Sequence, residues 1–146
     1  MLTVFNVADY FLSLVDTDSG DNITNLKLQK LVYYAQGFHL AMYNKPLFAE
    51  EIQAWEHGPV VPVLYQKYKK YGSGAIPVPT GIDFDIYSEE QKELFNEVYN
   101  VYGQYSAWRL RDFTHEEPPW RNTNKKDVIT HGKLKKYFDT QLVDDE

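Results

Sequence analysis

Two short proline-containing segments carry most of the side chains that could do chemistry or bind a partner. In the first, an indole and an imidazole, Trp55 and His57, come directly before a Gly-Pro turn. The second, residues 114–120, combines a hydroxyl, an imidazole, two carboxylates and an indole with two prolines. Because proline restricts the backbone, side chains on such segments lose little entropy on binding. Two interpretations of the second segment stay open. It is either a preorganised recognition surface, or a structural segment in which Thr114 and Glu117 satisfy nearby backbone amides while Trp120 plugs the core.

The nucleophiles and metal ligands argue against an enzyme. The chain has no cysteine and no Gly-x-Ser-x-Gly motif, the pattern that exposes a nucleophilic serine. None of its four histidines stands four residues from another, the spacing at which two imidazoles bind one metal ion from a helix. We therefore expect no catalytic residue, no metal and no cofactor. A hydrolase that uses His57, His115 and Glu116 stays open as an alternative.

Composition indicates one small domain over residues 1–146. The chain has 146 residues, of which 43% are hydrophobic, and it has no cysteine from which to form disulfides, so one hydrophobic core must stabilise it. No basic leader precedes the first apolar residues, and no run of about 18 apolar residues occurs. We expect a cytoplasmic protein that has no membrane contact.

The net charge of −6 disfavours binding to nucleic acids, because that binding depends on lysine and arginine displacing phosphate counterions. One stretch nevertheless combines basic and aromatic side chains that could contact phosphates and stack on bases. Its members are Lys67, Lys69, Lys70, Tyr65, Tyr68 and Tyr71. A nucleic-acid-associated regulator therefore stays an alternative, although nucleic acid is not the partner we expect.

Hydrophobic periodicity predicts a mainly α fold. Residues 24–43 are apolar around much of the helical circumference, which is typical of a central, buried helix. Apolar spacing, caps and turn residues predict the other helices at residues 4–15, 62–71, 89–102, 106–112 and 130–138. The prediction is a compact single-domain bundle of five to six helices around the central hydrophobic helix, with at most a small β-hairpin.

That hairpin would pair Ile52–Trp55 with Ile82–Ile86, since both segments are short and flanked by turn residues. Pro118 and Pro119 are read as part of a loop that follows the helix at residues 106–112. The stretch from Gly72 to Gly81 is read as a surface loop within the same domain.

Four segments resemble the Panacea antitoxin domain family, which includes SocA-like and phage-associated GepA-like proteins. The matching segments are residues 23–37, residues 45–48, residues 54–62 with Tyr65, and residues 114–117 with Pro119-Trp120. They occur in the family's order and span nearly the whole chain. One departure is visible: the family usually has a glycine before the Pro-Trp pair, where this chain has Pro118.

The resemblance implies an antitoxin that neutralises a toxin encoded by a neighbouring gene through direct protein–protein binding, with an origin in a prophage or mobile element. SocA-like members deliver the toxin to the ClpXP protease as adaptors, so a protease is a second implied partner. Sequestration and delivery both stay open, as does the oligomeric state. The matched motifs supply the candidates for partner binding: Lys27, Lys30, Tyr33, Tyr34, Trp55, His57, Pro59, Thr114, His115, Glu116, Glu117 and Trp120.

Among these candidates, we expect seven side chains to cluster around the central helix: Tyr33, Tyr34, Trp55, His57, His115, Glu116 and Trp120. Lys27 and Lys30 carry positive charges on that helix. We expect them to pair with Glu116 or Glu117.

Overall fold

The computed structural model describes residues 1–142, and a 19-residue helix, α2 (Asn25–Tyr43), forms its centre. Thr24 begins this helix because its side chain accepts a hydrogen bond from the backbone N–H of Lys27. Asn44 ends it in the left-handed conformation, with φ 56°. Most residues of α2 are buried, which confirms the predicted central helix.

Six further α-helices surround α2 in the described residues, so the mainly α prediction is confirmed with one or two more helices than expected. The helix predicted to reach Tyr71 changes to 3-10 geometry at Lys69. None of the helices within residues 1–142 has both the length and the apolar character needed to cross a membrane. The elements are α1 (Val4–Ser13), α3 (Pro62–Tyr68), α4 (Glu89–Tyr102), α5 (Ala107–Glu116), α6 (Pro118–Arg121) and α7 (His131–Asp139), with the 3-10 helices η1 (Thr17–Ser19), η2 (Lys69–Tyr71) and η3 (Phe84–Ile86).

The strand pairing differs from the predicted one. Strand β1 (Gln53–Trp55) pairs in antiparallel register with β2 (Gly58–Val60), so the hairpin is local. The expected partner, residues 82–86, instead contains η3. A local hairpin costs less loop-closure entropy than pairing with a distant segment. Its tight turn depends on the glycine that begins β2, which has φ 110°, a conformation that other residues rarely adopt.

Residues 114–116 and 118–120 are helical, which corrects the predicted loop. Helix α5 continues to Glu116, and Pro118 and Pro119 form the first turn of α6. Proline fits there because a first-turn residue has no intrahelical acceptor for its N–H. Glu117 is extended, with φ −92° and ψ 135°, the conformation favoured before a proline. Pro118 therefore suits the backbone at the position where the family usually has glycine.

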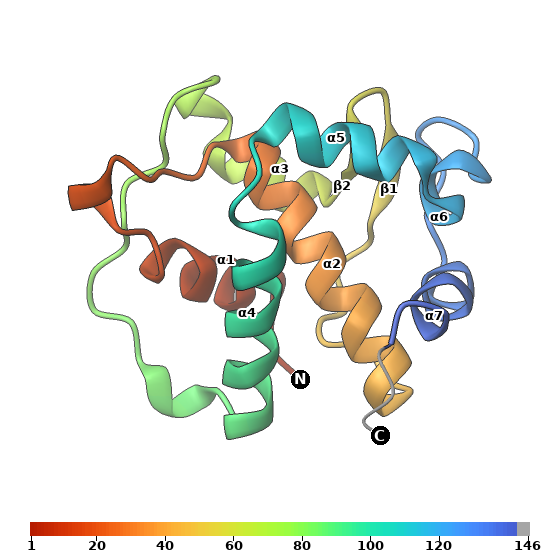
Figure 1. Ribbon diagram of the computed structural model, residues 1–146, viewed down its shortest axis with the longest axis horizontal. Helices are drawn as coiled ribbons and strands as arrows, with labels where there is room; N and C mark the ends of the chain where they lie inside the picture. The colour runs from red at the N-terminus through yellow and green to blue at the C-terminus, as the bar shows by residue number, and fades with distance from the viewer. Residues whose placement is uncertain (143–146) are drawn as a thin grey trace.

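Figure 1 shows α2 crossing the middle of the molecule, with α1 and α4 on one side and α7 and the hairpin on the other. Helix α7 packs closely on α2 because Gly37 leaves room for a ring. A Cβ atom at Gly37 would lie 2.2 Å from the ring of Phe138. That ring is fully buried and meets Tyr33 and Phe38 edge to face. The contact between α2 and α7 thus depends on a missing side chain.

Replacing Gly37 with alanine is expected to destabilise the protein. Overpacking a core costs about 1–3 kcal/mol, more than the gain of up to about 1 kcal/mol from replacing a helical glycine. The control is Gly132→Ala in α7, where the nearest heavy atom to the new Cβ is 3.9 Å away. That change should stabilise the fold by up to about 1 kcal/mol. Urea unfolding measures both, and equal effects at the two sites would contradict the close packing at Gly37.

Candidate functional site

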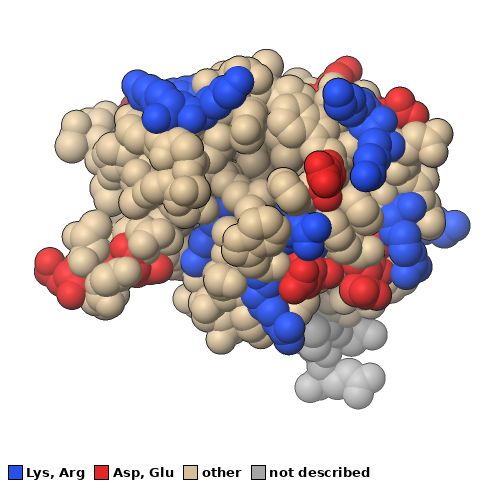
Figure 2. All heavy atoms as spheres, turned by 90° about the horizontal axis from the view of Figure 1, so that it is seen from above, with Lys and Arg blue, Asp and Glu red and all other residues tan. Residues whose placement is uncertain are grey.

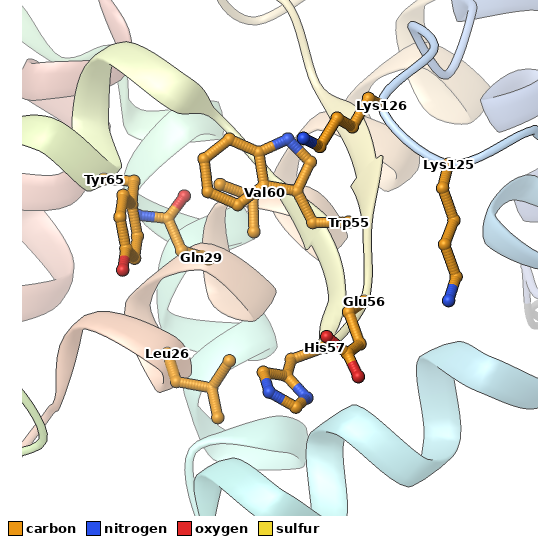
Figure 3. A pocket seen from close by; sticks show the side chains of 9 residues that line it. All are labelled: Leu26, Gln29, Trp55, Glu56, His57, Val60, Tyr65, Lys125 and Lys126. Carbon is orange, nitrogen blue, oxygen red and sulfur yellow. The ribbon is translucent and has the colours of Figure 1, made fainter.

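A groove beside the hairpin contains two of the predicted residues, Trp55 and His57. Its cavity volume is about 380 Å³ and its lining is mainly apolar. Figure 3 shows side chains from α2, the hairpin, α3 and the loop before α7 converging on it. We call this cavity the Trp55 groove, and its lining residues are Leu26, Gln29, Trp55, Glu56, His57, Val60, Tyr65, Lys125 and Lys126.

Three contacts fix the position of Trp55. Its indole N–H donates to Gln53 Oε1 at 3.0 Å. The ring of Tyr65 meets it edge to face, with 5.1 Å between ring centroids. The indole N–H of Trp120 donates to the backbone carbonyl of Trp55 at 2.7 Å. The result is a half-buried ring held in one place, and such rings supply binding surface at low entropy cost.

Trp120 and His115 support the hairpin from the α5 and α6 side. Their rings stack in parallel, with centroids 3.9 Å apart and an interplanar angle of 5°. Burial lowers the pKa of His115, and the nearby charge of Arg111 lowers it further. Trp120 is half-buried and packs against the hydrophobic core, and it is not among the described residues that line the groove. Trp120 acts on the Trp55 groove through its hydrogen bond to the backbone of Trp55, and His115 supports Trp120 by stacking on it.

The rim next to the hairpin turn carries a second exposed indole, Trp108. His57 lies at this turn, and its Nδ1 accepts a hydrogen bond from Arg111 Nε at 3.1 Å. The Trp108 ring is 57% exposed and meets the His57 ring edge to face at 5.3 Å. The guanidinium of Arg111 lies 5.1 Å from the Trp108 centroid and pairs with Asp112 at 3.3 Å. Sequence reasoning missed Trp108, which stands outside the matched motifs.

Lys27 and Lys30 do not pair with Glu116 or Glu117, which corrects that expectation. Lys27 Nζ donates to the carbonyl of Gly103 at 2.6 Å, at the end of α4. A cation is favoured there by the helix dipole. Lys30 is fully buried, and its Nζ donates to the carbonyl of Pro59 at 3.1 Å. Burial lowers the pKa of Lys30 to about 7.

Pro59 in β2 and Thr114 in α5 are packing residues at the hairpin. Both are buried, and the Thr114 hydroxyl donates to the carbonyl of Arg111 at 2.8 Å. A Cβ at Gly58 would lie 2.7 Å from both Lys30 Cε and Thr114 Oγ1. Glycine at this position thus allows β2 to contact α2 and α5 directly.

Glu117 is a buried carboxylate held by tyrosines. It is 9% exposed and accepts hydrogen bonds from the hydroxyls of Tyr33 at 2.8 Å and Tyr34 at 2.9 Å. Burial raises the pKa of Glu117 to about 7, while these hydroxyls and that of Tyr137 act in the opposite direction. Tyr33 and Tyr34 therefore seal the core rather than face a partner, and the neighbouring Glu116 is exposed.

The candidates thus form two groups instead of one cluster. Trp55 and His57 line the groove, whereas most of the others hold the hairpin or the core in place. Sequence reasoning missed Lys125 and Lys126, because an adjacent lysine pair in a turn-rich segment carries no binding pattern by itself. Within residues 1–142, no group of three or more His, Asp or Glu side chains is arranged to hold a metal ion.

Comparison with known proteins places the chain in a family. Residues 28–121 match the family described as "Antitoxin SocA-like, Panacea domain". Antitoxin SocA of Caulobacter vibrioides is 33% identical over 122 residues, which cover 75% of this chain and 61% of that protein. No solved structure matches the chain. The chain belongs to the SocA-like Panacea antitoxin family, and it spans less than two thirds of the length of this relative.

Glu117 is expected to make the protein less stable as pH rises from about 4.5 to about 7. Its pKa is about 7 in the fold and ordinarily 4.5, so in this window the folded state keeps a proton that the unfolded chain releases. At about 1.4 kcal/mol per pH unit, the loss amounts to about 3 kcal/mol. Glu117→Gln should remove this component.

The measurement is urea unfolding of both proteins at pH 4.5 and pH 7. The free-energy difference between the two proteins should shift in favour of the variant at the higher pH. A difference that stays constant would show that the carboxyl ionises normally in the fold.

Proposed function

We propose that this protein is an antitoxin that neutralises a toxin encoded by a neighbouring gene, and that it does so by direct binding through the Trp55 groove and its rim. One observation carries the proposal. Residues 54–62, which lie within the match to the antitoxin family, contribute Trp55, His57 and Val60 to a rigid aromatic groove that opens to solvent. Exposed aromatic rings set in a fixed frame are typical of binding hot spots.

The rim extends the surface beyond the groove itself. A stable protein interface buries about 800 Å² on each partner, so the groove would serve as the anchor of a larger contact. Trp108 adjoins it through the ring of His57 and exposes further ring surface. Figure 2 shows the molecule from above, where basic and acidic side chains lie beside one another over much of the face.

The adaptor role that the resemblance implies is a second step of the same proposal. In that step the bound toxin would pass to a ClpXP-type protease in the cytoplasm. Sequestration alone would also neutralise the toxin. Degradation of the toxin in cells, with and without the protease, separates the two mechanisms.

The two alternatives receive less support from the structure. Lys67 Nζ lies 5.2 Å from the ring of Phe5, and Lys70 Nζ lies 5.3 Å from the ring of Tyr71, so these lysines already contact aromatic rings of the chain. For a hydrolase, the imidazoles are poorly placed, because His57 accepts from an arginine and the Nε2 of His115 is buried without a partner in the described residues.

Coexpression with the neighbouring gene tests the proposal. The neighbour alone should arrest growth, and this protein should restore growth and copurify with the neighbour's product. A neighbour that is harmless by itself would contradict the antitoxin proposal.

Trp55→Ala is expected to abolish rescue while the protein stays folded, because a hot-spot residue contributes about 2 kcal/mol or more to binding. Trp120→Ala should also impair rescue, by removing the support of the Trp55 backbone. The control is Met42→Ala, which truncates a 47% exposed side chain on α2, about 24 Å along the helix from Leu26. Circular dichroism checks the fold, and full rescue by folded Trp55→Ala would place the contact elsewhere.

A further inference from the structure

Lys126 occupies a strained backbone position at the Trp55 groove. Its φ is 71°, in the left-handed region, which costs a residue with a side chain roughly 1–2 kcal/mol relative to glycine. Such conformations persist where surrounding contacts enforce them, and they concentrate at functional sites. A stability argument alone favours glycine here, so the presence of lysine calls for another reason.

Backbone hydrogen bonds to β1 enforce this conformation. The N–H of Lys126 donates to the carbonyl of Ala54, and the N–H of Ala54 donates to the carbonyl of Asp127 at 3.0 Å. Two residues further on, the N–H of Ile129 donates to the carbonyl of Ile52 at 2.8 Å. Residues 126–129 therefore run alongside β1, and Lys126 is fixed relative to Trp55. Figure 3 shows its side chain extending toward the Trp55 indole.

The positive charges of the two lysines that line the groove, Lys125 and Lys126, are uncompensated. Within residues 1–142, no carboxylate lies within 4.0 Å of the Lys125 or Lys126 ammonium. Both residues are exposed. Glu56 is the single acidic residue of the described lining. The two adjacent lysines therefore give the groove a local positive charge on a chain of net charge −6.

The remainder of the lining is apolar and aromatic. Leu26, Val60 and the ring pair Trp55–Tyr65 supply carbon surface. A ligand that satisfies the whole groove thus needs an apolar side chain for this surface and an anion for the lysines. A peptide in which a leucine or aromatic residue is flanked by aspartate or glutamate has both features.

We propose that the Trp55 groove binds an acidic segment of a partner protein, with one apolar side chain against Trp55 and Tyr65 and flanking carboxylates that pair separately with Lys126 and Lys125. The inference rests on the proposed function in one respect: the acidic segment is taken to belong to the toxin. A single-stranded nucleic acid has anions and flat bases too, but it carries a charge at every nucleotide, and the described lining of the groove offers two lysines to neutralise them.

The test uses synthetic peptides as probes of the purified protein. The acidic probe is acetyl-Gly-Asp-Glu-Leu-Leu-Glu-Asp-Gly-amide, and the neutral probe replaces each acid with its amide. Binding is followed by the NMR signal of the Trp55 indole N–H. An exposed ion pair changes affinity by roughly 1.4- to 5-fold, so two pairs should favour the acidic probe by roughly 2- to 30-fold at low salt. Equal affinity for the two probes would overturn the proposal.

Two variants locate the effect. Lys126→Glu should remove the preference for the acidic probe, whereas the matched charge reversal Lys136→Glu on α7 should leave it unchanged. Lys126→Gly should weaken acidic binding and at the same time raise the stability of the protein, since glycine relieves the strained φ. Higher stability with undiminished acidic binding would show that Lys126 serves the backbone alone. Tighter binding of an oligo(dT) probe than of the acidic peptide would favour nucleic acid and contradict the inference.

Coexpression separates this inference from the proposed function. If wild-type protein rescues growth, and Lys126→Glu rescues equally with no preference for the acidic probe, the inference is wrong and the antitoxin proposal stands. If wild-type protein fails to rescue but prefers the acidic probe, the antitoxin proposal is wrong and the groove chemistry stands.

Discussion

The structure depends on satisfying the polar side chains of a helix that is buried on nearly all sides. A buried polar group without a partner costs free energy, so each polar side chain of α2 must find one inside the protein. The side chain of Gln36 accepts from the N–H of Leu47 at 2.7 Å and donates to the carbonyl of Phe48 at 2.8 Å. Gln29 accepts from the N–H of Val61 at 2.9 Å. The polar groups of α2 thereby determine where the surrounding loops run.

This constraint makes the Trp55 groove rigid. Gln29 and Lys30 bind the backbone of β2 and the residue that follows it. On the other side, Trp120 holds the carbonyl of Trp55. The hairpin is short, and a two-stranded hairpin alone is only marginally stable in water. Neighbouring side chains therefore fix the position of the hairpin. Lys30 is buried, so it supports the Trp55 groove without lining it.

Local signals allowed much of the fold to be predicted. The caps Thr24 and Ser88 give the starts of α2 and α4 because a side-chain oxygen next to an apolar repeat has a local meaning. The predicted strand pairing was wrong. The observed pairing of β1 with β2 depends on a tight turn, and the sequence signals that turn only through the glycine after His57. The prolines of α6 were read as a loop because proline is common both in loops and in a helix's first turn.

The candidate site was harder to predict, since motifs do not tell core from surface. Tyr33 and Tyr34 could face a partner or a buried carboxylate, and only the packing of α2, α5 and α7 decides between them. Lys126 gave no local signal, because its conformation arises from hydrogen bonds to a segment about 70 residues earlier in the chain.

The backbone on both sides of the hairpin is already occupied, and this restricts how a partner can bind. The free edge of β1 is covered by residues 126–129, and that of β2 faces Gln29 and Lys30. An extended peptide therefore has no open edge to extend, so β-augmentation is excluded at this hairpin. The same coverage protects it from edge-to-edge aggregation. Selectivity here must reside in side chains, which can change among relatives while the scaffold stays the same.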